Sequence, residues 1–565
     1  MKNALGDVSR LERSSRIKIM NDIILNKRKR SLRVMMKGLY CIAFFTLHSS
    51  LFTSCDKYLD VLPDNRAELN SDANITELLT NAYPVTSYFM VAELFSDNTD
   101  HCIGSNSYTA FNNSGTTLHE EASTWQDIHD KNQDSPYAIW ESCYKSIAAA
   151  NNVLDAIEKQ DNPERLKGQR GEALLCRAYC HFILGNIFCM PYSTKTCNQV
   201  LGMPYMRSTE TTVSPTYERG TLAELYRNIA ADIEEGLPLI DDNIYKVPKY
   251  HFNKKAAQAF AARFYLYYMQ DDKSNLDKSI AYATQALTAT PSDMMRDWKA
   301  LGALSAGSAQ YNAFIDASQK ANLLIISVNS YWTWIYGPTA VAKGYCHCTR
   351  ISDTETINST GFWGSKEKVH MKATQVSGSP KITFYKMGQY VEYTDIVNGK
   401  GYPKMIVPAF TTDALILDRA EAYALKGDYA KAYQDLTTWT NAFTANAGAI
   451  TAAQLETTYG SAKPYYTPTE PTPKKRLNPD FTVSSGEQEN LIHAVLHARR
   501  VTTLHEGLRW FDVKRYGIEI YRRHVDGTLG DGNISVFDTM PKDDPRRAIQ
   551  LPPYVINAGI TANPR

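Results

Sequence analysis

The spacing of apolar residues predicts helices through most of this chain. Between Tyr137 and Glu158, apolar side chains return every three or four positions, which places them on one face of a helix. The same spacing predicts further helices over residues 169–187, 221–235, 253–269, 276–288, 414–426, 429–443 and 491–516, after a first helical pattern that begins near Ile75. Residues 300–410 lack this spacing and are rich in Ser, Thr, Gly and aromatic residues, so we expect irregular loops with a few strands there.

Two of the predicted helix pairs resemble tetratricopeptide units. Ala256 and Ala283 lie on consecutive helices, and Ala420 and Ala432 lie on either side of a Gly-Asp-Tyr turn. Small alanines let paired helices approach, while Tyr and Leu fill the space between pairs. We therefore predict a mainly α fold. It consists of a tetratricopeptide-like scaffold of helical pairs and an irregular, loop-rich half that binds the ligand. The scaffold covers mainly residues 137–290 and 411–517, the loop-rich part mainly 300–410; the alternative is a set of unrelated antiparallel helices.

The first 54 residues have the layout of a secretory signal. A basic cluster over residues 27–37 precedes an apolar run from Leu39 to Phe52. The run has about 14 residues, fewer than the ~20 that a membrane-spanning helix needs. The long stretch before this apolar run favours a start of translation at Met35 or Met36. We predict a signal region over residues 1–54.

Cys55 follows this signal directly and has two interpretations. It is either an ordinary residue after a cleavage site or the cysteine of a bacterial lipobox, which receives lipid chains. A lipobox prefers Leu three positions before the Cys, where this chain has Phe52, with Leu51 one residue earlier. Two or more acyl chains hold a protein stably on a membrane. We expect a lipid-anchored Cys55, a tether over 55–72 and a folded domain over 73–565.

Composition and charge exclude nucleic acid as a partner. Hydrophobic residues make up 43% and charged residues 21% of the chain, as in ordinary globular proteins. The formal net charge is +1, but basic residues concentrate in the first 54 positions and leave a mildly acidic remainder. Such a surface does not attract a polyanion.

A search for catalytic motifs finds none. The sequence has no phosphate-binding loop of the Gly-x4-Gly-Lys type and no Gly-x-Ser-x-Gly motif. His119 and His505 are each followed by Glu, as in zinc proteases, but the second histidine positions hold Ser123 and Arg509. Residues 526–538 resemble a calcium loop without its closing Glu, and we expect a turn-rich loop there. We predict a protein that is not an enzyme and carries no cofactor.

The cysteines form two groups in the sequence. Cys176, Cys180, Cys189 and Cys197 make up the first group, and the second is the Cys-His-Cys segment 346–348. Neither group has the paired Cys-x2-Cys spacing of a closed zinc site, so we predict no metal site. We expect these cysteines to pack in the core, although outside the cytoplasm some cysteines can pair.

Several segments, in order along the chain, resemble the SusD-like (RagB/SusD) lipoproteins. The most specific is Glu506–Gly517, with the pattern Glu-Gly-x-Arg-Trp-Phe-Asp-Val-Lys-Arg-Tyr-Gly. The other matching segments are Cys55–Asp60 with Pro63, Arg170–Phe182, Ala230–Pro238, Ala256–Leu266 and Leu551–Pro553. The chain departs from the family at Phe188–Pro191, where a Gly-Asp-x-Pro is usual, and at Thr411 and Asp413, where Arg and Glu are expected.

The resemblance implies a nutrient-binding lipoprotein on the outer surface of a bacterial outer membrane. Proteins of this family most often capture glycans, and they cover a SusC-like, TonB-dependent transporter as a lid. We therefore expect a glycan ligand, a transporter partner and a membrane contact through the lipid anchor. Three alternatives stay open: the same scaffold binding peptides or another nutrient, a tetratricopeptide-type protein adaptor, and an enzyme such as a glycosidase.

Aromatic residues in two segments are the candidates for the ligand site. Sugars bind flat aromatic faces and polar side chains on loops held by a rigid scaffold, and the resemblance places such loops at residues 97–117 and 330–363. The candidates are Asp100, Asn106, Tyr108, Asn112, Trp332, Trp334, Tyr336 and Trp363. The alternative for 331–336 is a β-strand with one face in the core.

The Glu506–Gly517 segment is interpreted as a structural helix rather than as part of the ligand site. One turn of helix separates Arg509 from Asp512 and Asp512 from Arg515, so either pair can form an ion pair.

Overall fold

The computed structural model describes residues 71–102, 116–210, 216–337, 344–377, 379–446, 448–527 and 529–565. Leu69–Arg565 form one compact unit. The predicted signal region and Cys55 lie outside the described residues. Within the described ranges, every helix is too short or too polar to cross a membrane.

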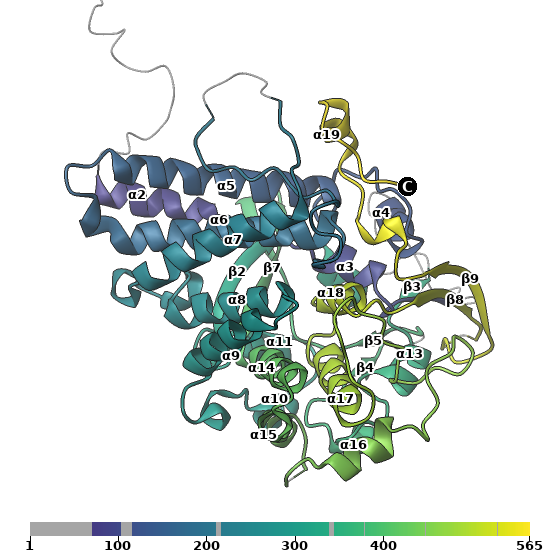
Figure 1. Ribbon diagram of the computed structural model, residues 1–565. Coiled ribbons are helices and arrows are strands. Elements are labelled where there is room, and N and C mark those ends of the chain that lie inside the picture. The colour runs from purple at the N-terminus through teal and green to yellow at the C-terminus, as the bar shows by residue number, and fades with distance from the viewer. Residues whose placement is uncertain are drawn as a thin grey trace, which may run out of the picture. The chain divides into compact units, whose positions relative to one another are not determined.

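Packed helical pairs form the scaffold of the protein, so the prediction of a mainly α fold is confirmed (Figure 1). α5 packs against α6 and α6 against α7, while α8 packs on α9 and α14 on α15. The bounds of these helices and their neighbours are α2 (Asp72–Leu79), α5 (Pro136–Glu158), α6 (Lys167–Phe188), α7 (Leu222–Gly236), α8 (Lys254–Tyr267), α9 (Ser274–Leu287), α14 (Thr412–Lys426), α15 (Tyr429–Phe443) and α17 (Glu487–Thr502).

Local capping residues explain why the predicted helix bounds agree closely with the observed ones. Ser135 accepts a hydrogen bond from the backbone N–H of Ala138 at the start of α5. Thr221 and Glu224 form a reciprocal capping box at the start of α7. Gly427 ends α14 with φ +85°, a conformation that a residue with a Cβ adopts only at a cost. These signals are local, so the sequence alone reveals them.

The helix predicted over residues 491–516 is instead two helices, α17 and α18 (Leu508–Arg515). Between them, His505 and Gly507 have positive φ, and their N–H groups donate to the carboxylate of Glu93 at 2.8 and 3.1 Å. A Cβ at Gly507 would lie 2.9 Å from the Cβ of Ala92. Packing against α3 (Phe89–Phe95) therefore interrupts the helical period.

Residues 300–410 contain more regular structure than predicted. The three-stranded antiparallel sheet β2–β7–β6 crosses this region. Its strands are β2 (Asn322–Asn329), β6 (Gln389–Asp395) and β7 (Lys400–Thr411). The short helices of the region are α10 (Trp298–Gly302), α11 (Ser308–Ile315), α12 (Trp332–Tyr336) and α13 (Thr349–Glu355). The aromatic segment around Trp332 is therefore helical and is not the alternative β-strand.

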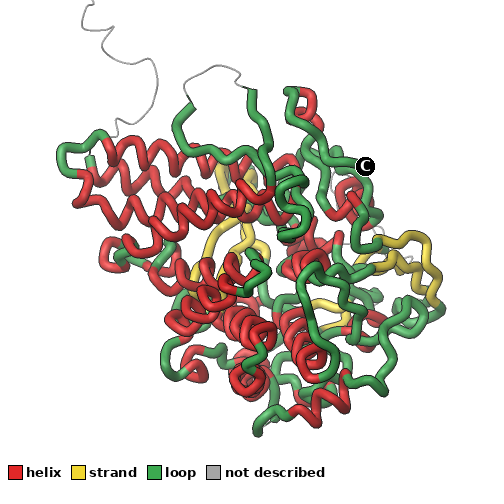
Figure 2. The backbone as a smooth tube through the Cα atoms, viewed as in Figure 1, coloured by secondary structure: helices red, strands yellow, loops and turns green. Residues whose placement is uncertain are grey.

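A second sheet joins distant parts of the chain in the order β3–β1–β8–β9. β1 (Asp100–Cys102) and β3 (Tyr345–Cys346) pair with each other, and β8 (Ile520–Val525) and β9 (Ile534–Met540) form a hairpin. The segment 526–538, predicted as a turn-rich loop, thus runs through the turn into β9. Figure 2 shows the strands as short segments among helices and loops. The remaining short elements are the strands β4 (Thr374–Gln375) and β5 (Ile382–Thr383) and the helices α4 (Thr116–Ser123), α16 (Ala452–Tyr459) and α19 (Pro553–Asn557).

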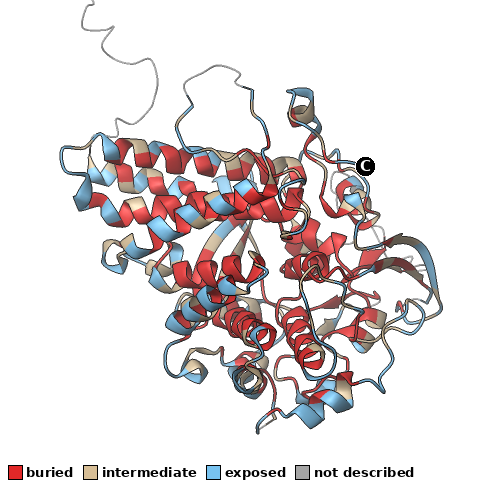
Figure 3. Ribbon diagram, viewed as in Figure 1, coloured by how far each residue is buried: buried red, intermediate tan, exposed pale blue. Residues whose placement is uncertain are grey.

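One continuous apolar core runs between the helical pairs and the loop-rich part (Figure 3). Trp298, Trp363, Trp439 and Trp510 are among its largest fully buried side chains. The cysteines of the 176–197 group are buried as free thiols, as expected for core packing. The core thus holds together the scaffold on which surface sites are built.

Candidate functional site

An open groove of about 720 Å³ lies against one face of the β2–β7–β6 sheet. Ser327 on β2 pairs with Ile406 on β7, so their side chains share the face that forms the floor. The walls come from η1 (Thr80–Ala82) with the segment after it, from η5 (Pro248–Tyr250) and from the end of α11. The floor and walls of the groove therefore combine segments that are far apart in the sequence.

Three tyrosines line this groove. Tyr250 is 51% exposed, Tyr390 is half-buried, and Tyr83 lies deeper with 8% of its surface exposed. Tyr390 pairs with Lys404, and this register puts its ring on the same face as Ile406. Open aromatic rings beside a few polar groups are typical of small-ligand sites.

A buried carboxylate fixes the inner end of the groove. Glu172 on α6 accepts hydrogen bonds from the Tyr83 hydroxyl at 2.5 Å and from His251 Nδ1 at 2.9 Å. The Tyr83 oxygen in turn accepts the N–H of Phe252 at 2.6 Å. Burial, followed by the nearby Cys176 and Glu172, raises the pKa of Tyr83 well above its usual value. Tyr83 therefore stays a neutral phenol in one position.

Three of the aromatic candidates from the sequence are buried. Trp332 donates its indole N–H to the carbonyl of His505 at 2.8 Å, and Tyr336 donates to the carbonyl of Met387 at 2.8 Å. Trp363 is fully buried, with its ring 5.7 Å from that of Trp439. Their rings contribute to the core, and none of the three has a face open to a ligand.

Trp334 is the candidate whose ring remains half-exposed. Its ring centroid lies 5.1 Å from that of Tyr331. Buried Asp134 holds this segment, because it accepts hydrogen bonds from the Ser330 hydroxyl at 2.6 Å and from the N–H of Tyr331 at 2.7 Å. Burial raises the pKa of Asp134 to about 7.

Three further candidates, Asn106, Tyr108 and Asn112, lie outside the described residues, so the structure does not place them beside Trp334 or beside the groove.

Asp100, the remaining candidate, belongs to a buried ionic network. Its carboxylate accepts two hydrogen bonds from Arg523, at 2.9 and 2.6 Å. Glu355 contacts Arg523 at 3.0 Å, Lys475 at 2.7 Å and Arg500 at 3.1 Å. Because Asp100 is 1% exposed and already paired, its carboxylate is held for structure rather than offered to a ligand.

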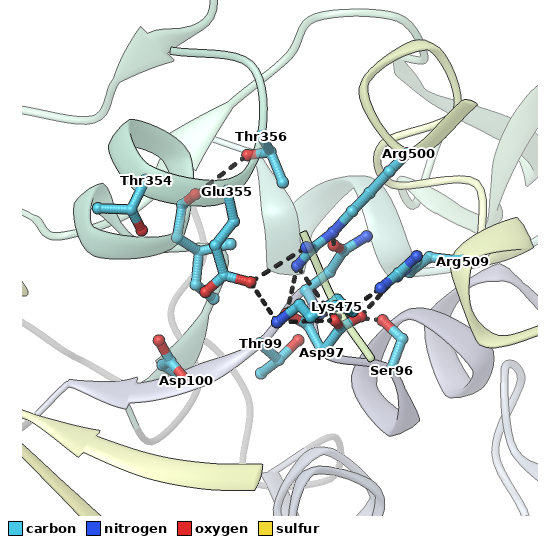
Figure 4. A network of polar contacts seen from close by, with 12 residues as sticks. Ser96, Asp97, Thr99, Asp100, Thr354, Glu355, Thr356, Lys475, Arg500 and Arg509 are labelled. Carbon is cyan, nitrogen blue, oxygen red and sulfur yellow. Dashed lines mark hydrogen bonds and ion pairs between the residues drawn. The ribbon is translucent and has the colours of Figure 1, made fainter. Parts of the chain in front are cut away.

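Asp97 is the second centre of this network, and Figure 4 shows the cations gathered around it. Arg509 donates to both Asp97 oxygens at 2.7 and 2.9 Å, and Lys475 lies 3.3 Å away. Arg509 was expected to pair with Asp512; it contacts Asp97 instead, while Asp512 pairs with Arg515 at 3.3 Å, as expected. Burial alone would raise the pKa of Asp97, but the surrounding cations, with Arg500 first, lower it well below its usual value.

Comparisons with known proteins show what this architecture is similar to. Residues 57–266 match a SusD-like family model described as "Starch-binding associating with outer membrane". A solved structure of a putative sugar binding protein from Bacteroides vulgatus aligns with a TM-score of 0.59 at 17% identity, covering 88% of this chain and 98% of that chain. A SusD superfamily protein from Bacteroides thetaiotaomicron aligns with a TM-score of 0.56 at 17% identity, covering 87% and 98%. This protein has the SusD-like fold. A search of curated proteins found no match to its sequence.

In this SusD-like fold, the sequence did not predict the groove. Tyr83, Tyr250 and Tyr390 lie in three separate segments, and none stands in a dense aromatic run. The only cue was the large number of tyrosines, 35 against 19 Phe. Among the described residues, no group of three or more His, Cys, Asp or Glu side chains is placed to hold a metal ion.

Proposed function

We propose that this SusD-like protein is a cell-surface lipoprotein of a bacterial outer membrane that captures a glycan in the sheet groove. The observation that carries the proposal is the open tyrosine surface of Tyr250 and Tyr390 above an apolar floor. Sugar rings stack on such faces, and nearby polar groups orient them. The family description as starch-binding and the sugar-binding relative support this ligand class.

The charge of the groove favours a neutral glycan over an anionic one. Among the described residues that line it, Asp316 is the only carboxylate, and there is no lysine or arginine. An anionic sugar would therefore meet a like charge, while the nearby Lys404, opposite Tyr390, already pairs with Glu392 at 3.0 Å. We propose a neutral oligosaccharide or polysaccharide as the ligand.

The captured glycan is proposed to pass to a SusC-like, TonB-dependent outer-membrane transporter. Lipidation of Cys55 would keep the protein on the membrane that holds this partner. Trp334, with Asn106, Tyr108 and Asn112, remains a proposed second contact for the ligand. The domain division into a signal region, a tether over 55–72 and a folded domain over 73–565 is part of the same proposal.

Tyr250→Ala and Tyr390→Ala are each expected to weaken glycan binding about three- to tenfold. A stacked ring contributes roughly 0.5–1.5 kcal/mol, and 1.4 kcal/mol corresponds to a factor of ten. Calorimetry with starch-derived and other neutral oligosaccharides measures the loss. The matched control is Tyr393→Ala, because Tyr393 is 55% exposed but lies on the opposite face of β6 from Tyr390.

The control and the groove variants should differ in binding and agree in melting temperature. If Tyr393→Ala weakens binding as much as Tyr250→Ala, or neither groove variant changes it, the groove is not the glycan site. Trp334→Ala then shows whether the second contact carries the ligand. If peptides bind and none of the tested oligosaccharides does, the result would support the alternative in which the same scaffold captures peptides.

Cys55→Ala is expected to leave the protein unprocessed or soluble, because the lipid chains attach to this thiol. Membrane fractionation and labelling with a fatty acid measure the effect, and Ser54→Ala, which keeps a small residue before the cysteine, is the control. A Cys55→Ala protein that stays membrane-bound at its normal processed size would show that the anchor lies elsewhere.

A further inference from the structure

Three buried cysteines from distant segments meet beside the β1–β3 strand pair. Cys102, Cys346 and Cys348, with Ile351, form a small cluster separate from the main core. Cys102 ends β1, and its N–H donates to the carbonyl of Gly344 at 2.9 Å. The sulfur atoms of Cys102 and Cys346 are 3.9 Å apart, although 244 positions separate these residues in the sequence.

The antiparallel register explains this approach. Asp100 pairs with Cys346 and His101 with Tyr345, so Cys102 and Cys346 occupy diagonal positions on the same face of the two strands. Side chains in such positions remain within reach of each other. The two sulfurs, now 3.9 Å apart, reach the bonding distance of about 2.05 Å by side-chain rotation together with a movement of the strand backbones towards each other.

The contacts of the third cysteine distinguish it from this pair. The thiol of Cys348 donates to the Asp100 carboxylate, with 3.7 Å between Sγ and Oδ2. Asp100 itself is held in place by Arg523. Cys348 therefore has a carboxylate partner besides its interaction with Cys102, whereas the sulfur of Cys346 lies 3.9 Å from that of Cys102.

We propose that Cys102 and Cys346 form a disulfide bond in the exported protein. The compartment rests on the proposed function, because disulfides persist outside the cytoplasm. The two thiols lose two protons and two electrons as the S–S bond forms. The electrons and protons pass to the disulfide of a thiol–disulfide oxidant, which is reduced to two thiols.

The surroundings of the thiols determine when the bond forms. Hydrogen bonding with Cys346 and Cys348, followed by burial, raises the pKa of the Cys102 thiol well above its usual value. Burial and the charge of Asp100 raise the pKa of Cys348. Because the thiolate is the reactive form, the folded cluster reacts slowly. The bond therefore forms during folding and is afterwards shielded from reductants.

The disulfide connects the two parts of the chain that the ionic network also joins. Cys102 follows Asp97 and Asp100 directly, while Cys346 and Cys348 precede α13, which ends at Glu355. A cross-link over such a long separation restricts the unfolded chain more than the folded one. Reduction after unfolding should therefore lower the melting temperature of the refolded protein by a few degrees.

Mass spectrometry of the full-length protein, exported by a bacterial host, tests the proposal. The protein is denatured and alkylated with and without prior reduction, then digested. We expect a linked peptide pair that contains Cys102 and Cys346. The link should be lost in Cys102→Ser and in Cys346→Ser and retained in the matched control Cys348→Ser. Alkylation of all three cysteines without reduction, or a link between Cys102 and Cys348, overturns the proposal.

A second measurement separates this inference from the proposed localisation. The same full-length chain is unfolded under reducing conditions and refolded in a glutathione redox buffer, while cell fractionation reports its compartment. A link in the refolded chain supports the pairing even if the chain is not exported, a result that would contradict only the proposed function. Protein that reaches the envelope without the link overturns the inference and leaves the proposed function standing.

Discussion

Replacing Trp510 with alanine is expected to destabilise the protein by about 3–5 kcal/mol, as for other large truncations in a core. Trp510 on α18 is fully buried, and its ring packs edge-on against Phe95 of α3 with 5.6 Å between ring centroids. The smaller side chain would leave a cavity that surrounding helices cannot fill without losing other contacts. Unfolding by denaturant, followed by fluorescence and circular dichroism, measures the loss.

Trp334→Ala is the matched control for Trp510. Its ring is half-exposed on α12, so its removal should cost clearly less, about 1 kcal/mol. A Trp510→Ala protein with an unchanged melting temperature and lost glycan binding would contradict the structural role of the Glu506–Gly517 segment. That segment would then belong to the ligand site.

Glu355→Gln is the second substitution for which a large loss of stability is expected, about 3–5 kcal/mol. Glu355 is fully buried and contacts Lys475, Arg500 and Arg523 within 3.1 Å. Without its charge, these buried cations share only the carboxylates of Asp97 and Asp100. Removing one partner of a buried ion pair is costly because the remaining charges stay desolvated.

An exposed ion pair provides the control for this substitution. Glu392 lies 3.0 Å from Lys404 with 60% of its side chain exposed, and Glu392→Gln should change stability by less than about 1 kcal/mol. Equal losses from the two substitutions would show that the buried network does not stabilise the fold.

Acid should reveal the same network. Burial alone would raise the pKa of Glu355, but Lys475, Arg523 and Arg500 lower it to about 2. The unfolded chain then binds a proton near pH 4.5 that the folded protein does not, so this contribution is complete above pH 4.5 and is lost as pH falls towards 2. Between these values, the free energy of unfolding should fall less steeply in Glu355→Gln than in wild type.

Two other buried acids, Glu93 and Asp134, are the same in wild type and in Glu355→Gln and do not disturb this test. Burial raises the pKa of Glu93 and of Asp134 to about 7, so their contributions decline as pH rises from their ordinary values towards 7. In the unfolded chain both acids titrate near pH 4, but wild type and Glu355→Gln share them, so this effect cancels in the comparison. The same acid slope in wild type and Glu355→Gln would show that Glu355 is not held as a charged group.

The helical scaffold could be predicted because its signals are local. The apolar period and the Gly427–Asp428 turn together placed α15 at Tyr429–Phe443, where the structure has it. The segments that resemble the SusD-like family also lie mainly in helices, so the fold followed from neighbouring residues. The chain itself thus determined the helical pairs, their caps and the order of the main elements.

The site depended on contacts that neighbouring residues do not encode. The density of aromatic residues around Trp332 was plain in the sequence, but α12 turns Trp332 and Tyr336 into the core, where their polar atoms bond to His505 and Met387. Likewise, Asp100 looked like a ligand contact until β8 brought Arg523 to it across 423 positions of sequence. Burial is a property of the assembled structure, and a list of residue types cannot state it.

Periodicity, caps and family motifs determined from the sequence alone that this protein is a mainly α, SusD-like scaffold, because each depends on residues within a few turns of one another. Tertiary structure alone decided three things: the break between α17 and α18, the partner of Arg509, and the groove of Tyr83, Tyr250 and Tyr390. Each of these joins residues that are far apart along the chain. Such contacts form only when the apolar core and the buried ion pairs bring whole segments together, and their geometry then selects which side chains face a ligand.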